Sequence, residues 1–356
     1  MGMQWDLFCR VIDNYGDIGV SWRLARDLAA RGQGVRLWLD DAAPLQWMAP
    51  QPRPAGIDVL PWGDPAADLS DSDVVIETFG CELPGAFIAR MAAQARPPLW
   101  LNLEYLSAEA YVERSHGLAS PQFSGPGRGL AKSFFYPGFT ERTGGLLREP
   151  GLLQAQARFD AQAWLAAQGI QRPKPETQIV SLFAYPNAAL PELLDGLAQQ
   201  DCLLLVCAGQ VQEEMLALRR AQALPAGLQW QALPYLSQSD FDHLLWACDF
   251  NFVRGEDSFV RAQWAGKPFV WQIYPQTDGA HAPKLEAFMD RWLAGADSTM
   301  AADYRQLWRS WNGLQAWQGL PWPGTLALRH AQDWRDLLTQ QNDLTSQLLG
   351  LAHKTS

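Results

Sequence analysis

The fold is decided by the stretch WDLFCRVIDNYGDIGVSWRLARDLAARGQGVRLWLDD, residues 5–41. Its first part, residues 5–12, is mostly apolar and predicts a buried strand, and residues 35–41 predict a second one. Between them Val20, Leu24 and Leu28 recur at helical spacing, and Gly32 follows as a helix stop. This order of strand, loop, helix and strand is a βα unit, so it predicts a parallel sheet covered by helices.

The same alternation continues along the chain and predicts two Rossmann-like domains. Further strands of the first series are expected at 73–78, 98–105 and 132–139, and the second series is expected at 178–185, 202–209, 228–235, 248–253 and 268–275. Helices between the strands of the second series are expected at 191–200, 211–222, 239–247, 258–265 and 279–294.

The segment QRPKPET, residues 171–177, contains no apolar side chain except its prolines and is the most linker-like part of the chain. We therefore expect domains at 1–173 and 174–329, and a long terminal helix from residue 330 that packs back on the first domain. In such an α/β protein, ligands bind outside the carboxyl ends of the strands, here in a central cleft between two facing domains.

Composition excludes several classes of protein. Of the 356 residues 48% are hydrophobic and 19% charged, which excludes an intrinsically disordered chain. The net charge of −10 argues against nucleic-acid binding, and the absence of an apolar run of 18 residues argues against a membrane span. Five scattered cysteines without a CxxC or HExxH motif favour reduced thiols, no metal site and a cytoplasmic location. The 17 tryptophans exceed what packing of an ordinary domain requires, and the sequence assigns none of them to a ligand.

The loop Asp13-Asn14-Tyr15-Gly16-Asp17-Ile18-Gly19 lies where the first strand passes into the first helix. This is the sheet edge at which α/β folds place their reactive groups, and two carboxylates there indicate a polar site. The alternative is that Asp17 caps the helix and that the glycines only permit the turn. A dinucleotide fingerprint is excluded because only two of its three glycines are present.

A second loop of this kind lies in NFVRGEDSFVRAQW, residues 251–264. The amides of a helix N-terminus, the Ser258 hydroxyl and the guanidinium groups of Arg254 and Arg261 would hold a diphosphate. Glu256 and Asp257 would accept hydrogen bonds from sugar hydroxyls. The alternative is an ordinary N-cap made by Asp257 or Ser258.

Aromatic side chains end two strands of the second series, Phe183 and Tyr185 after one and Tyr235 after the other. Their rings would stack on a nucleobase, although aromatic residues at strand ends more often pack in a core.

Four segments together resemble the EarP family, the bacterial protein-arginine rhamnosyltransferases that modify translation elongation factor P. They are FCRVIDNYGDIGVSWRLAR (8–26), FFYPGFTERTGGLLRE (134–149), SLFAYPN (181–187) and NFVRGEDSFVRAQWAGKPFVWQIYPQ (251–276). The resemblance runs from residue 4 to about residue 340.

This resemblance implies an inverting, metal-independent glycosyltransferase with the GT-B fold. Its donor would be dTDP-β-L-rhamnose and its acceptor an arginine guanidinium of elongation factor P, with no further cofactor. The first domain would bind the acceptor and the second the nucleotide sugar. The implied catalytic residues are Asp17, Asp13 and Glu256. The implied donor-binding residues are Asn14, Tyr15, Gly16, Phe183 or Tyr185, Tyr235, Arg254, Gly255, Glu256, Asp257 and Ser258.

Two alternatives stay open from the sequence. One is a GT-B transferase that uses another nucleotide sugar or another acceptor. The other is a non-catalytic protein that binds a nucleotide sugar, in which Asp13 and Asp17 would serve only as caps.

Overall fold

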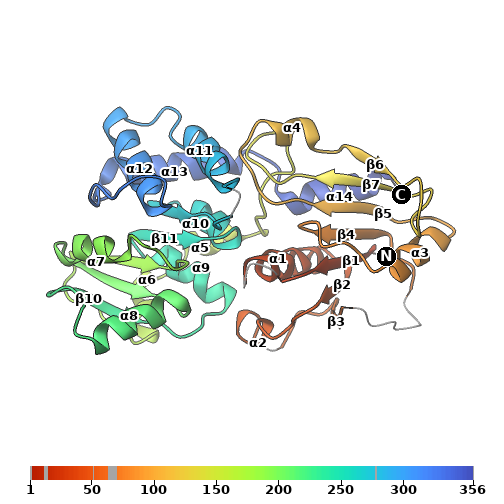
Figure 1. Ribbon diagram of the computed structural model, residues 1–356. Helices are drawn as coiled ribbons and strands as arrows, with labels where there is room; N and C mark the ends of the chain where they lie inside the picture. The colour runs from red at the N-terminus through yellow and green to blue at the C-terminus, as the bar shows by residue number, and fades with distance from the viewer. Residues whose placement is uncertain (1, 12–14, 51, 63–69, 277–278, 356) are drawn as a thin grey trace. The chain divides into compact units, whose positions relative to one another are not determined.

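A computed structural model of the protein describes residues 2–11, 15–50, 52–62, 70–276 and 279–355 (Figure 1). Two compact units make up the chain. The first contains residues 1–150 and 340–356, and the second contains residues 151–339.

The first unit is built on a seven-stranded sheet in the order β3-β2-β1-β4-β5-β7-β6. All neighbouring strands are parallel except β6 and β7, which pair antiparallel. The strands are β1 (Gln4–Cys9), β2 (Gly34–Leu39), β3 (Ile57–Pro61), β4 (Val74–Thr78), β5 (Leu99–Leu103), β6 (Ala119–Pro121) and β7 (Ala131–Phe135). The helices of this unit are α1 (Gly16–Ala30), α2 (Leu45–Met48), α3 (Gly85–Ala93), α4 (Tyr111–Ser115) and α14 (Leu344–Thr355).

One face of this sheet is covered by α1 and α14 (Figure 1). Ile18, Leu24 and Leu28 of α1 and Leu344 and Leu348 of α14 are all buried in one apolar cluster with the inner sheet strands. The spacing of these side chains puts them on one side of each helix, which is why the helices lie flat on the sheet. The N-terminus of α1 is thereby held at the carboxyl edge of β1.

A charged group is buried inside this sheet. Asp6 of β1 is completely buried, and its carboxylate accepts hydrogen bonds from Arg36, Trp38 and Ser72 over 2.6–2.8 Å. Because each carboxylate oxygen has donors, the cost of burying the charge is offset by the network. Only one register of β1 on β2 brings Asp6 opposite Arg36, so the network specifies the strand pairing.

The second unit is built on a five-stranded parallel sheet in the order β10-β9-β8-β11-β12. Its strands are β8 (Gln178–Leu182), β9 (Cys202–Val206), β10 (Gln229–Ala232), β11 (Phe250–Arg254) and β12 (Phe269–Gln272). Its helices are α5 (Leu152–Ala157), α6 (Ala161–Ala167), α7 (Leu190–Ala198), α8 (Gln210–Arg220), α9 (Gln238–Ala247), α10 (Asp257–Ala265), α11 (His281–Trp292), α12 (Ser298–Trp311) and α13 (Thr325–Thr339).

Tryptophan supplies much of the packing of both units. Among the largest completely buried side chains are Trp5, Trp22, Trp38, Trp292, Trp308 and Trp311. In the second unit Trp308 stacks on both Phe288 and Trp292, with ring centroids 5.6 and 5.3 Å apart. These contacts show that the buried tryptophans serve in packing. This agrees with the sequence analysis, which assigned none of them to a ligand.

Two parts of the expected domain organisation are wrong. The first unit ends at Pro150 and not near residue 173, because α5 and α6 belong to the second unit, where Leu165 and Ile170 enter its core. The expected single helix from residue 330 is two helices, and only α14 lies on the first unit. The polar residues 340–343 interrupt it, and the Asp343 carboxylate caps α14 by accepting a hydrogen bond from the Ser346 amide.

Candidate active site

One group of candidate residues is at the start of α1 in the first unit. Asp17 is in the first turn of this helix and is 2% exposed. The Ser21 hydroxyl donates to the Asp17 backbone carbonyl, and the Tyr105 hydroxyl donates to the Asp17 carboxylate at 3.3 Å. Expected site residues Asp13 and Asn14 lie outside the residues that the structure describes. The structure therefore provides one nearly desolvated carboxylate at the carboxyl edge of the sheet.

The structure describes two other residues of this loop that were expected at the site, Tyr15 and Gly16. Gly16 is the first residue of α1, and Tyr15 directly precedes it. The Tyr15 ring meets the Trp47 ring edge to face, with centroids 5.2 Å apart. Their expected role in binding a nucleotide sugar stays a prediction.

The surroundings of Asp17 are poorly solvated. Burial raises the pKa of the nearby Cys9 thiol to about 12, and the negative charge of Asp17 adds to this rise. Cys9 is thus a neutral side chain at neutral pH. A carboxylate in such surroundings interacts more strongly with a cation than it would in water.

The residue that the sequence did not indicate is Tyr105, two positions after β5. Its ring stacks on that of Phe79, which follows β4, with centroids 4.3 Å apart and planes 14° from parallel. Phe79 has a φ of 58°, a left-handed conformation that bulky side chains rarely adopt and that costs on the order of 1–3 kcal/mol. The only available signal for Tyr105 was its place at the end of an expected strand.

A second group of candidate residues is at the loop between β11 and α10 in the second unit. Gly255 has a φ of 61°, its amide donates to the Gln272 carbonyl, and its carbonyl accepts from the Trp271 indole at 2.7 Å. Trp271 itself stacks on Phe259 of α10, with centroids 3.8 Å apart. Strand β12 and helix α10 therefore hold this loop in one conformation.

Phe183 and Tyr185 both lie against Arg254. The Arg254 guanidinium carbon is 4.5 Å from the Phe183 ring centroid and 4.4 Å from that of Tyr185. Tyr185 is only 5% exposed, while Phe183 is half-buried. Both rings thus make a cation–π contact with the arginine, and stacking of either on a nucleobase stays a prediction.

The Ser258 hydroxyl joins the two ends of the same loop. It accepts a hydrogen bond from the Arg254 amide at 3.0 Å and donates one to the Arg254 carbonyl. The N-cap residue of α10 is Glu256, whose side chain makes no capping hydrogen bond. Glu256 and Asp257 are both half-buried. Two half-buried acidic side chains therefore lie at the N-terminus of α10, where the helix dipole favours negative charge.

Arg261 does not share the position expected for it. Its side chain is 2% exposed and forms a two-pronged ion pair with Asp242 of α9, at 2.9 and 2.8 Å. Arg254 is therefore the arginine of this motif that lies at the loop. Tyr235, by contrast, follows β10 and is 52% exposed.

Across the described residues, no three His, Cys, Asp or Glu side chains come together as a metal site. No helix among them is both long and apolar enough to cross a membrane.

Comparison with known proteins gives matches over nearly the whole chain. The chain is 46% identical to the protein-arginine rhamnosyltransferase of Pseudomonas aeruginosa, covering 97% of this chain and 98% of that one. It is 37% identical to the protein-arginine rhamnosyltransferase of Shewanella oneidensis, covering 99% and 98%.

Solved structures agree with these matches. The chain is similar to a structure described as the structural basis for EarP-mediated arginine glycosylation of translation elongation factor EF-P, with a TM-score of 0.66 and 32% identity over 99% and 100% of the two chains. It also resembles the glycosyltransferase VinC in complex with dTDP, with a TM-score of 0.53 and 14% identity over 99% of each, which shows the fold alone. The expected fold class, α/β with two Rossmann-like domains of the GT-B type, is confirmed.

The model of one family, described as Elongation-Factor P (EF-P) rhamnosyltransferase EarP, matches residues 5–353. The chain therefore belongs to the EarP family.

Proposed function

We propose that this protein is an inverting protein-arginine rhamnosyltransferase. It transfers L-rhamnose from dTDP-β-L-rhamnose to a guanidinium nitrogen of one arginine of translation elongation factor P, in the cytoplasm. The observation that carries this proposal is membership of the EarP family over residues 5–353. Asp17 in one unit and the loop before α10 in the other are the chemical parts that such a reaction requires.

The second unit would bind the donor. The diphosphate of the donor carries negative charge, which the N-terminus of α10 and the Arg254 guanidinium would stabilise. The exposed ring of Tyr235 would stack on the thymine, a contact worth about 1–3 kcal/mol. Glu256 and Asp257 would accept hydrogen bonds from the sugar hydroxyls and so orient the anomeric carbon.

The first unit would bind the acceptor arginine through Asp17. An arginine guanidinium has a pKa above 12, so a carboxylate cannot remove its proton before reaction. Asp17 would instead pair with the guanidinium, direct one nitrogen toward the anomeric carbon, and accept its proton as the carbon–nitrogen bond forms. Asp13, four residues earlier, would support it.

The reaction would be a single displacement. The nitrogen attacks the anomeric carbon from the face opposite the departing dTDP, so the β-linked donor gives an α-linked product. The electron pair of the breaking carbon–oxygen bond leaves with dTDP, whose charge Arg254 and the α10 N-terminus would stabilise without a metal ion.

A mass measurement tests the proposal. We expect purified elongation factor P to gain the mass of one deoxyhexose residue when it is incubated with the protein and dTDP-β-L-rhamnose, with EDTA present. A panel of other nucleotide sugars and an acceptor in which the target arginine is replaced by lysine serve as controls. Gain of another sugar would favour the transferase with a different donor, and binding without any product would favour the non-catalytic alternative.

The stereochemistry needs a separate measurement. The one-bond carbon–hydrogen coupling at the anomeric carbon of the product distinguishes the two configurations. Finding the β-linked product would refute the single displacement.

A further inference from the structure

We infer that Tyr105 is a positioning residue for Asp17: its hydroxyl orients the carboxylate that receives the acceptor proton. This inference rests on the proposed function, because it concerns how the Asp17 carboxylate is held during the transfer. The residues that carry it are in the first unit and come from three separate strand ends of one sheet.

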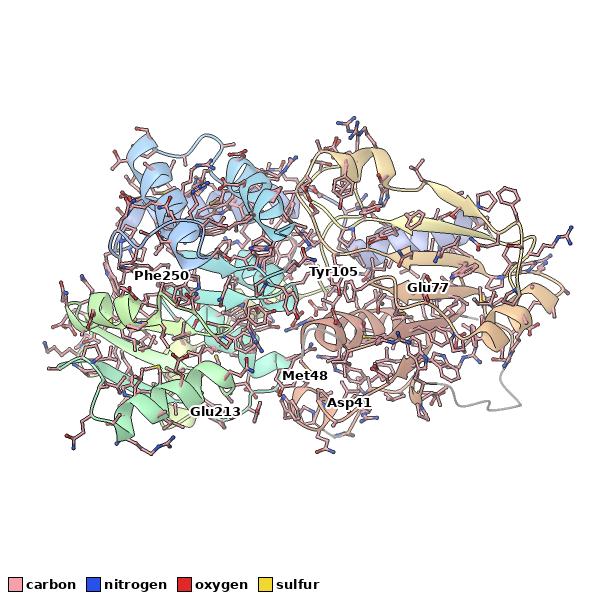
Figure 2. The ribbon with its side chains drawn as sticks, viewed as in Figure 1. Asp41, Met48, Glu77, Tyr105, Glu213 and Phe250 are labelled. Atoms are coloured by element: carbon pink, nitrogen blue, oxygen red, sulfur yellow. The ribbon has the colours of Figure 1, made fainter. Side chains whose placement is uncertain are left out.

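The hydrogen bond itself is the first observation. The Tyr105 hydroxyl donates to Oδ1 of Asp17 at 3.3 Å across 88 residues of sequence. Tyr105 is 37% exposed, whereas Asp17 is 2% exposed, so the phenol is the more accessible partner of the pair. Figure 2 labels Tyr105 among the side chains of the first unit. A hydroxyl bonded to one carboxylate oxygen restricts rotation of the carboxylate and leaves its second oxygen in a defined direction.

The second observation is that the Tyr105 ring has its own support. It stacks on the Phe79 ring, and the two planes differ by only 14°. An exposed tyrosine without such a contact would sample several rotamers, and its hydroxyl would hold Asp17 for only part of the time. The stacked ring is restricted to the orientation in which its hydroxyl reaches Asp17.

The third observation is that Phe79, the residue whose ring supports Tyr105, has an unusual backbone conformation. Phe79 has a φ of 58°, and its amide donates to the Leu103 carbonyl at 2.7 Å. The next amide, that of Gly80, donates to the Asn102 side chain at 3.0 Å. These bonds tie the end of β4 to β5, the strand that leads to Tyr105. A conformation of this kind persists only where its surroundings impose it, and such positions concentrate at active sites.

These observations give Tyr105 a role distinct from that of Asp17. A phenol hydroxyl donates its proton in a hydrogen bond. Asp17 alone takes the proton from the guanidinium. The contribution of Tyr105 is the geometry of the carboxylate, which matters most as the proton moves.

The test compares three single variants and one double variant with the wild-type protein. Tyr105→Phe keeps the ring on Phe79 and removes only the hydroxyl. Tyr111→Phe removes the hydroxyl of another exposed tyrosine of the first unit, 40% exposed, and is the matched control. Asp17→Ala removes the hydrogen-bond acceptor, and it is combined with Tyr105→Phe in a double variant. Rhamnose transfer is measured at saturating donor with the acceptor varied, and single-turnover rates are used for the slow variants.

We expect Tyr105→Phe to lower kcat about tenfold, the low end for a hydrogen bond to a charged group because the bond is long, while the acceptor KM changes less than about twofold. Tyr111→Phe should retain the wild-type kcat. In the Asp17→Ala protein, Tyr105→Phe should change the residual rate less than about twofold, because the hydroxyl acts only through Asp17. The melting temperatures of Tyr105→Phe and the wild type should agree within about 1 °C. If the hydroxyl had only a structural role, its removal would lower the melting temperature as well as kcat.

Three results would overturn the inference and can be told apart. Wild-type protein that transfers no rhamnose would refute the proposed function and this inference with it. Full activity of Asp17→Ala would remove the group that Tyr105 is inferred to position. An active wild type, an impaired Asp17→Ala and an unimpaired Tyr105→Phe would overturn the inference and leave the proposed function standing.

Discussion

Replacing Asp17 by asparagine tests the proposed chemistry most directly. The amide has nearly the same shape as the carboxylate and can still accept the Tyr105 hydrogen bond, so the change removes the charge and the proton acceptor with little other disturbance. Positioned general-base assistance contributes about 10²–10⁴-fold to a rate. Because Asp17 is 2% exposed, little water is available to take its place as a base. We therefore expect kcat to fall at least about 10³-fold, which corresponds to about 4 kcal/mol.

The assay is a time course of acceptor mass under single-turnover conditions. Calorimetric titration with dTDP should give an unchanged affinity, because the donor motif belongs to the second unit. The melting temperature should not fall, since the substitution removes a charge from a buried position. Asp58→Asn, at an exposed aspartate of β3 in the same unit, is the matched control and should retain wild-type kcat.

A loss of less than tenfold in Asp17→Asn would refute the assignment of Asp17 as the base. A large loss accompanied by an equal loss of dTDP affinity would refute the reasoning that Asp17 acts independently of dTDP binding.

Other perturbations address the second unit, the titrating groups and the thiols. Tyr235→Ala should weaken dTDP binding about 5- to 150-fold by calorimetry, from loss of a stacking contact of about 1–3 kcal/mol. Trp271→Phe should lower the free energy of unfolding by roughly 1–3 kcal/mol in urea, because the buried Gly255 carbonyl loses its donor. Burial lowers the pKa of His116, whose neutral ring accepts a hydrogen bond from the Tyr136 amide. The unfolded chain then binds the extra proton more readily, so stability should fall as pH drops below about 6.5. All five cysteines are buried and burial raises the pKa of each, so iodoacetamide at pH 8 should label none in the native protein and all five in urea.

Each of these expectations has a control or a contrary outcome. Tyr235→Phe keeps the ring and should bind dTDP within about twofold of wild type. Trp317→Phe, at a half-buried tryptophan of the same unit, should unfold as the wild type does. His116→Asn should flatten the pH dependence of stability below about pH 6.5, and an unchanged slope would contradict the role of this histidine. Labelling of any cysteine in the native protein would contradict its burial.

The two loops at the site could be found from the sequence because their position depends on local order. An apolar strand followed by a polar, glycine-containing loop and an amphipathic helix places that loop at the carboxyl edge of a parallel sheet. The strands expected around residues 5–12 and 248–253 are β1 and β11, and the loops that follow them lead into α1 and α10.

Other features could not be found in this way because they depend on contacts between distant segments. The division after Pro150 follows from the packing of α5 and α6 within the second unit. The proline-rich segment 171–177 does not reveal that packing. By its spacing alone Arg261 is as suited to a diphosphate as Arg254 is, and the ion pair with Asp242 is what distinguishes the two arginines.

The sequence by itself thus determined the fold class, the two loops and the family, because strand and helix periodicity and local motifs are properties of neighbouring residues. Only the tertiary structure decided which side chains act together at those loops. The contact of Tyr105 with Asp17 joins residues 88 positions apart, and that of Trp271 with Gly255 joins two different strand ends. Such contacts arise when parallel strands align their carboxyl ends at one edge, and no local pattern in the chain encodes that alignment.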